Sequence, residues 1–155
     1  MGGASRNKGA RGEREMVRLL RQHLDPEHWQ VERFGTGESG HDIRITGLRG
    51  DVFPWAIEVK RYADFDIGEV VRPPPSQRWL NWWRQAKVQA ATVGREPLLV
   101  CRGDRRPWWA FTFWDVDNSP SYIEINHEDW RSIIGRPLED IIGQLPFAGG
   151  WTPRA

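Results

Sequence analysis

The sequence contains a single cysteine, Cys101, among its 155 residues. One thiol excludes an intrachain disulfide, so noncovalent packing must hold the fold, and a reducing compartment is the natural setting. No apolar run approaches the roughly 18 residues that a membrane-spanning helix needs. Residues 1–12 lack an apolar core as well, which argues against a secretory signal. We therefore expect a cytoplasmic protein with no membrane partner.

Net charge is nearly absent too, at +1, but the charged residues are unevenly distributed. Residues 1–24 hold six Arg and Lys side chains against two acids, whereas residues 115–140 hold seven acids against two arginines. A basic end on a near-neutral chain is a modest indication of a polyanionic partner. A solvated charged face is the alternative interpretation.

Internal repeats and long linkers are also missing from the sequence. Its 39% hydrophobic and 28% charged residues are ordinary for a globular protein, and a chain of this length can bury a hydrophobic core. We predict that residues 1–10 form a flexible basic arm and that residues 11–155 form a single domain.

Hydrophobic periodicity predicts both helices and strands in this domain. The first helix is predicted over residues 11–24, where Met16, Val17 and Leu20 share one face and Glu13 lies at the N-terminal end of that face. The remaining elements are predicted as strands over 29–34, 41–46, 52–61, 97–102, 108–114 and 122–125, and as helical segments over 77–93, 127–134 and 137–145. This order indicates a mixed α/β core.

Polar residues with catalytic potential occur on two of the predicted strands. Glu58 and Lys60 are two residues apart, so in a strand they emerge on the same side. Asp42 lies on the polar face of the preceding strand, and antiparallel neighbours are only about 5 Å apart. Two carboxylates that meet repel each other unless a cation lies between them, and hard oxygen ligands favour magnesium or manganese.

This combination suits the hydrolysis of a phosphodiester. A magnesium ion held by Asp42 and Glu58 would lower the pKa of a bound water and polarise the phosphoryl group. Lys60 could orient the water or hold a phosphate oxygen. Glu13, which faces the core from the first helix, could supply a third carboxylate. The structural alternative is that Asp42 caps a turn and that Glu58 and Lys60 lie on a solvated strand face.

Tryptophan is abundant, with ten residues in the chain. Several of them lie close to arginines in the sequence, and such aromatic side chains can stack on unpaired bases or line an interface. Core packing or a dimer contact is the competing interpretation for each one. The residues concerned are Trp79, Trp82, Trp83, Trp108 and Trp109.

Three ordered motifs carry a resemblance to a known family, and they read Lys8-Gly9-x-x-x-Glu13-Arg14-x-x-Val17, Ser39-Gly40-x-Asp42-Ile43 and Phe53-Pro54-Trp55-Ala56-Ile57-Glu58-Val59-Lys60. They resemble the archaeal and phage-type Holliday junction resolvases of the PD-(D/E)XK nuclease superfamily. The match covers roughly residues 8–61, with weaker support from residues 82–86.

The resemblance implies a restriction-endonuclease-like core with a mixed central sheet flanked by helices. It implies that Glu13, Asp42 and Glu58 bind metal and that Lys60 is the catalytic lysine. It also implies a homodimer that cuts four-way DNA junctions with a divalent cation, Mg²⁺, for which Mn²⁺ may substitute. A restriction- or repair-type endonuclease and a non-catalytic DNA-binding module are the alternatives.

The sequence departs from the family pattern at one position and leaves other roles open. His41 replaces the proline expected before the catalytic acid; it could carry protons or have no role. Asp51 is a rival for the acid, but we prefer Asp42 because Asp51 falls where a turn residue is expected. Gln85 could support the site or simply be an exposed helical glutamine. Contacts to DNA phosphates are predicted for Lys8, Arg11, Arg14, Arg44, Arg61, Arg72, Arg105 and Arg106.

Overall fold

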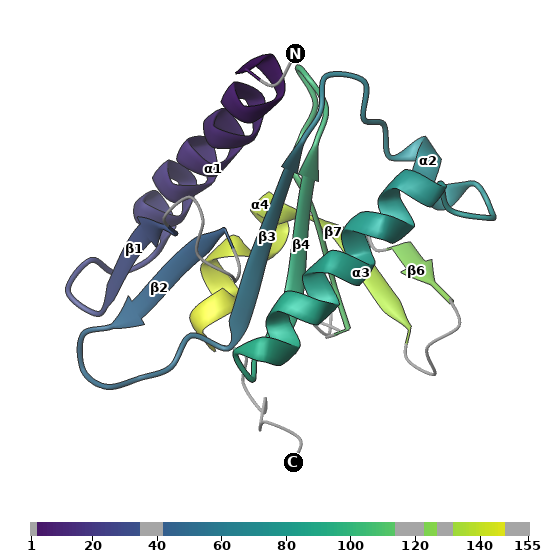
Figure 1. Cartoon of the computed structure of the whole chain (residues 1–155). Helices are drawn as coiled ribbons and strands as arrows, with labels where there is room; N and C mark the ends of the chain where they lie inside the picture. The colour runs from purple at the N-terminus through teal and green to yellow at the C-terminus, as the bar shows by residue number, and fades with distance from the viewer. Residues whose placement is uncertain (1–2, 35–41, 114–122, 127–131, 148–155) are drawn as a thin grey trace.

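The computed structural model describes residues 3–34, 42–113, 123–126 and 132–147 (Figure 1). Its elements follow the α-β-β-β-α-β-β order that the sequence predicts, with an added short helix before the second long one. They are α1 (Gly3–His23), β1 (Trp29–Arg33), β2 (Ile43–Gly47), β3 (Trp55–Arg61), α2 (Gly68–Val71), α3 (Gln77–Thr92), β4 (Glu96–Arg102), β5 (Trp109–Thr112), β6 (Ile123–Ile125), β7 (Ile133–Pro137), α4 (Leu138–Ile141) and the 3-10 helix η1 (Ile142–Phe147).

The strands form one mixed sheet of seven strands in the order β1-β2-β3-β4-β5-β7-β6. Only the central pair, β3 and β4, is parallel, and its register sets Glu58 beside Leu99 and Lys60 beside Cys101. The other paired strands are antiparallel. The predicted mixed central sheet flanked by helices is therefore confirmed.

Helices cover both faces of this sheet (Figure 1). On one face, Met16 and Leu20 of α1 pack with Val59 of β3 and with residues of α4 and η1. On the other face, Trp79 and Trp83 of α3 pack against β4 and β5. The middle of β3 is buried on both sides as a result, so a charged side chain placed there needs partners within the protein.

The tryptophans near arginines are mainly core residues. Trp79 is fully buried, and Trp82, Trp83 and Trp108 are each at most 8% exposed. The Trp79 and Trp83 rings lie parallel with centroids 6.2 Å apart. These side chains are thus covered within one chain, which is the core-packing interpretation, and the tryptophan face of α3 is not open to a dimer partner.

Helix α1 begins at Gly3, whereas the sequence predicted a flexible arm up to residue 10 and a helix from Arg11. Ala, Arg and Lys in this segment favour helix, while its glycines disfavour it, so the sequence has no clear start signal. A second difference concerns Ile133 and Ile134, which were predicted as helical but lie in β7, paired with β5 and β6. Pairing with neighbouring strands decides whether such short apolar segments become strand or helix.

Among the described helices, none is both long and apolar enough to cross a membrane.

Gly12 marks the closest approach of α1 to the sheet. A Cβ on Gly12 would come within 2.9 Å of Arg61 Cβ, whereas a Cβ on Gly9 of the same helix would meet nothing within 4 Å. Gly9→Ala is therefore expected to raise the free energy of unfolding by about 0.5–1 kcal/mol through helix propensity alone. Gly12→Ala should lower it by about 1–3 kcal/mol, because α1 must move away from β3. Urea denaturation of both variants tests this, and equal stabilisation by the two substitutions would contradict the close packing.

Candidate active site

The site begins where β2 separates from β3. The register pairs Ile43 with Ile57, and the backbone N–H of Asp42 donates to the Ile57 carbonyl at 3.0 Å. At the next step along β3, a side chain takes the place of a backbone hydrogen-bond acceptor on β2: Asp42 Oδ2 accepts a hydrogen bond from the Val59 N–H at 2.8 Å. Without a partner, this buried backbone donor would cost stability. The requirement for an acceptor fixes the Asp42 carboxylate against β3.

Glu58 and Lys60 extend from β3 towards α3. Glu58 is only 2% exposed, and its Oε1 lies 2.9 Å from Lys60 Nζ. Lys60 Nζ also donates to Gln85 Oε1 of α3 at 2.9 Å. The other carboxylate oxygen of Glu58, Oε2, is buried and has no hydrogen-bond partner. A buried oxygen that accepts no hydrogen bond from the protein is available as a ligand for an added cation.

These side chains line a cavity of about 190 Å³. The cavity brings together residues of α1, β3, α3 and the start of β2, which lie far apart in the sequence. It contains every residue predicted to be catalytic, and also the predicted support residue Gln85. The residues that line it are Gly9, Glu13, Asp42, Glu58, Val59, Lys60, Arg61, Tyr62 and Gln85.

The two neighbouring carboxyls are hard to ionise together. Burial, and then the charge of Glu58, raise the pKa of Asp42 to about 7, against the opposing effects of the Val59 N–H and Lys60. Burial also raises the pKa of Glu58, although Lys60 acts to lower it. Lys60 therefore supplies too little positive charge for the pair, and a divalent cation would relieve the remaining repulsion.

Glu13 reaches the same cavity but has a partner of its own. Arg33, on β1, donates to Glu13 Oε2 through Nη2 at 2.7 Å and through Nε at 2.9 Å. The Glu13 charge still acts on the pair, since it raises the pKa of both Asp42 and Glu58. In this arrangement Glu13 is an ion-paired acid at the edge of the site, and its role as a metal ligand stays a prediction.

The donor set suits magnesium better than it suits a zinc-type cage. Within the described residues, no group of three His, Cys, Asp or Glu side chains is arranged to hold a metal ion. Magnesium, however, is commonly held by one or two carboxylates, with waters and substrate phosphates completing its shell. Asp42 and Glu58 provide two such carboxylates, and the unpartnered Glu58 Oε2 faces no competing donor.

The rival acid Asp51 lies elsewhere. It is exposed in the turn after β2, and its Oδ2 lies 2.5 Å from His28 Nε2. Both residues line a different hollow, together with Trp29 and Val52, beyond the end of β2 that is remote from Asp42. The preference for Asp42 over Asp51 thus agrees with the geometry. His41 lies outside the described residues.

The predicted phosphate-binding residues fall into two groups. Arg11, Arg14, Arg44, Arg72 and Arg105 are exposed. Three of the predicted residues have partners within the chain: Arg44, whose Cζ lies 4.4 Å from the Phe34 ring centroid, and Arg61 and Arg106, of which Arg106 is also exposed. The Arg61 side chain is only 12% exposed and lies 3.2 Å from Asp104 and 3.6 Å from Glu15, and Arg106 is ion-paired with Asp66. The Lys8 side chain lies outside the described part of the chain.

Comparison with known proteins shows the family of this chain. The family model described as "Phage putative PDDEXK endonuclease" matches residues 4–131. The chain belongs to this family. Protein D14 of Escherichia phage T5 is 29% identical over 140 residues, which cover 84% of this chain and 88% of that protein. The solved structure of Archaeoglobus fulgidus Hjc, a Holliday junction resolvase from an archaeal hyperthermophile, matches with a TM-score of 0.46 and 16% identity, covering 88% of this chain and 96% of Hjc.

Family membership makes the chain a PDDEXK-type nuclease with a restriction-endonuclease-like core. Nucleases of this family generally use divalent metals. The buried acidic pair beside a lysine is consistent with that chemistry. The family model, like the sequence motifs, includes both β2 and β3, the strands that build the site.

Sequence reasoning missed three parts of the site. The Val59 N–H that orients Asp42 is a backbone group, so the residue type at position 59 does not indicate this contact. The ion pair of Arg33 with Glu13 joins two residues that are 20 positions apart in the sequence. Tyr62 was not among the predicted site residues, although it lines the cavity. Its position directly after Lys60 and Arg61, at the end of the catalytic strand, is the signal that could have identified it.

The raised carboxyl pKa values predict an unusual pH dependence of stability in the metal-free protein. Between pH 3.8 and about 7 the folded state holds a proton on Asp42 that the unfolded chain has released. The free energy of unfolding should therefore fall as pH rises through this window. Asp42→Asn removes the titration, so in EDTA its Tm should exceed that of wild type by about 2–4 °C above pH 7 and converge with it near pH 4.

Thermal melts across this pH range test the prediction, with Asp51→Asn as the matched control. Asp51 is an exposed acid outside the cavity, so its variant should keep the wild-type slope. A Tm difference between Asp42→Asn and wild type that does not change with pH would contradict the raised pKa of Asp42.

Proposed function

We propose that this chain is a divalent-metal-dependent endonuclease that hydrolyses phosphodiesters at four-way DNA junctions. The observation that carries the chemistry is that the half-buried Asp42 and the buried Glu58 share one cavity beside Lys60. The preference for junctions is supported by the motif resemblance over residues 8–61. Mg²⁺ is the proposed cation, with Mn²⁺ as a substitute.

Asp42 and Glu58 would hold the cation. One oxygen of Asp42 is occupied by the Val59 N–H, which leaves the other for a ligand bond, and Glu58 contributes the unpartnered Oε2. When bound, the cation supplies a lowered pKa for the attacking water and neutralises charge on the phosphate. Both carboxylates must be ionised to bind it, so the affinity for the cation should fall as pH drops, because protons compete for the same oxygens.

Lys60 is placed to act on the substrate. Its ammonium group has three donors, and two of them are directed to Glu58 and Gln85. The third remains for a phosphate oxygen or for the attacking water. Gln85 acts through Lys60, because its carbonyl oxygen fixes the position of Nζ above the cavity. Glu13, paired with Arg33, is the proposed third acid.

Arg11 and Arg14 of α1, together with Arg44, Arg72 and Arg105, would contact DNA phosphates. Such contacts provide affinity without reading sequence, which suits recognition of a branch by its shape. A homodimer is proposed because a junction with two-fold symmetry calls for two paired cuts. The cytoplasm of a phage-infected host cell is the proposed setting.

Cleavage assays with a four-way junction and a linear duplex of matching sequence test this proposal. In Mg²⁺, the wild type is expected to cut the junction in preference to the duplex. Asp42→Asn, Glu58→Gln and Lys60→Ala should each lower the cutting rate by about 100-fold or more, while DNA binding persists. Asp51→Asn, the matched acid outside the cavity, should cut at the wild-type rate.

Different outcomes point to different functions. Equal cutting of junction and duplex would defeat the junction preference, and discrete cuts in plasmid DNA would favour a restriction- or repair-type enzyme. A non-catalytic DNA-binding module predicts that Mg²⁺ changes neither cleavage nor Tm. Full activity in Asp42→Asn, Glu58→Gln and Lys60→Ala would show that the site assignment is wrong.

Binding to DNA is expected to depend steeply on salt. Arg11→Gln and Arg14→Gln on α1 should weaken binding to junction and duplex alike, and each should reduce the slope of log K against log salt by about 1. Arg49→Gln serves as control, because Arg49 is an equally exposed arginine in the turn at the far end of β2. If Arg49→Gln changed the slope by the same amount, the proposal that DNA binds along α1 would be wrong.

A further inference from the structure

Tyr62 is the aromatic side chain at the edge of the catalytic cavity. It follows the last residue of β3 and lines the cavity together with Glu58 and Lys60. Its backbone is fixed, since Tyr62 N donates to the Arg102 carbonyl and Phe65 N donates to the Tyr62 carbonyl, both at 3.1 Å. The side chain nevertheless remains 39% exposed. The ring is thus held at the edge of the cavity with part of its surface open to solvent.

One face of the Tyr62 ring rests on a buried tryptophan. The Tyr62 and Trp82 rings are stacked, with centroids 4.8 Å apart and planes 25° from parallel. Trp82 is only 7% exposed and packs on Phe65, with centroids 5.7 Å apart. Tyr62 is therefore the outermost ring of a stack that is anchored in the core.

Arg78 flanks this stack from the side. Its Cζ lies 5.6 Å from the Tyr62 centroid and 5.2 Å from the Trp82 centroid. An arginine above the outer face of Tyr62 would lie much farther from Trp82 than from Tyr62, because the two separations would add. The nearly equal distances place Arg78 beside both rings, so it does not cover the outer face of Tyr62.

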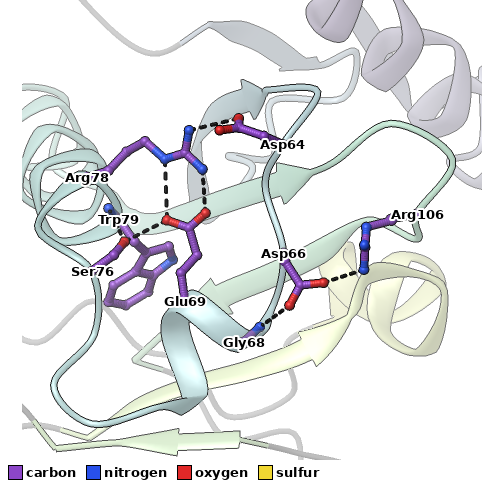
Figure 2. A network of polar contacts seen from close by, with 8 residues as sticks. All are labelled: Asp64, Asp66, Gly68, Glu69, Ser76, Arg78, Trp79 and Arg106. Atoms are coloured by element: carbon purple, nitrogen blue, oxygen red, sulfur yellow. Dashed lines mark hydrogen bonds and ion pairs between the residues drawn. The ribbon is translucent and has the colours of Figure 1, made fainter.

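The position of Arg78 is set by a polar network between the loop after β3 and the start of α3 (Figure 2). Its Nη1 donates to Asp64 at 2.9 Å, and its Nε and Nη2 contact the Glu69 carboxylate. Ser76, the N-cap of α3, donates to the same carboxylate at 2.7 Å. Arg78 is thus satisfied within the protein, and the stack it borders is preorganised.

We propose that the outer face of Tyr62 stacks on an unpaired nucleobase of the DNA substrate next to the phosphate in the cavity. The inference deepens the proposed nuclease function and rests on it for the nature of the substrate. Base stacking on an aromatic ring tolerates any sequence, since every base has a π face. Paired bases inside a duplex cannot offer a free face, so the contact would favour DNA that is opened at a branch.

Fluorescence of 2-aminopurine, an adenine analogue, tests this contact. The analogue is placed in turn at the nucleotides that flank the branch of a four-way junction, and also within a short single-stranded oligonucleotide. Complexes are formed in Ca²⁺ to observe binding separately from cutting. Wild type and Tyr62→Phe, which keeps the ring, should quench at least one position, whereas Tyr62→Leu should leave it bright and bind unpaired DNA about 5- to 100-fold more weakly.

Two results would overturn the proposal. One is the absence of quenching at every position with the wild type, which needs no variant. The other is equal quenching and affinity for Tyr62→Leu, Tyr62→Phe and wild type. Val88→Ala, at a 66% exposed position of α3 outside the cavity, controls for a general effect of surface substitution. If no metal supports cutting but the single-stranded oligonucleotide is still quenched in a Tyr62-dependent way, the nuclease proposal fails and the stacking site stands.

Discussion

Two carboxyl groups, the half-buried Asp42 and the buried Glu58, line one cavity at the point where β2 separates from β3, and the rest of the site depends on this constraint. The Asp42 carboxylate is fixed by the Val59 N–H, and Glu58 is fixed by its place in a strand covered on both faces. Glu58 cannot move to solvent without disturbing the core, and Asp42 can do so only by giving up its bond with the Val59 N–H. Their mutual repulsion and loss of hydration create a site that favours protons or a cation.

The fold supplies the remaining groups from elements that pack on opposite faces of the sheet. Helix α1 brings Glu13 to one side of the cavity, close to the point where Gly12 lets the helix approach β3. Helix α3 brings Gln85 to Lys60 on the other side. The parallel pair β3 and β4 lies between them and keeps the register of Glu58 and Lys60. The same packing anchors Trp82, on which Tyr62 rests at the edge of the cavity.

Local patterns in the sequence were enough to predict much of this arrangement. The two-residue period of β3 places Glu58 and Lys60 together, and the helical face of α1 turns Glu13 inward. The motif resemblance added the fold class, which the family match and the mixed sheet confirm. Gly94, with φ +65°, ends α3 close to the predicted position.

Tertiary contacts decided the clearest miss. Ile133 and Ile134 form a strand because β5 and β6 pair with them on either side. Residues 3–10 continue a helix for which the sequence shows no start signal. Arg61, predicted to bind phosphate, lines the cavity and also contacts Glu15 and Asp104, so its role stays a prediction. The β5 partners of β7 lie far away along the chain, where periodicity and propensity give no information.

A crystal structure with Mn²⁺ tests the central claim most directly, because manganese gives an anomalous signal that identifies the ion by itself. The account predicts an anomalous peak between Asp42 and Glu58, with oxygen ligands from both carboxylates and with Lys60 Nζ close by. A protein that cuts DNA with Mn²⁺ and yet shows its peak at another position, such as beside His28 and Asp51, would contradict it.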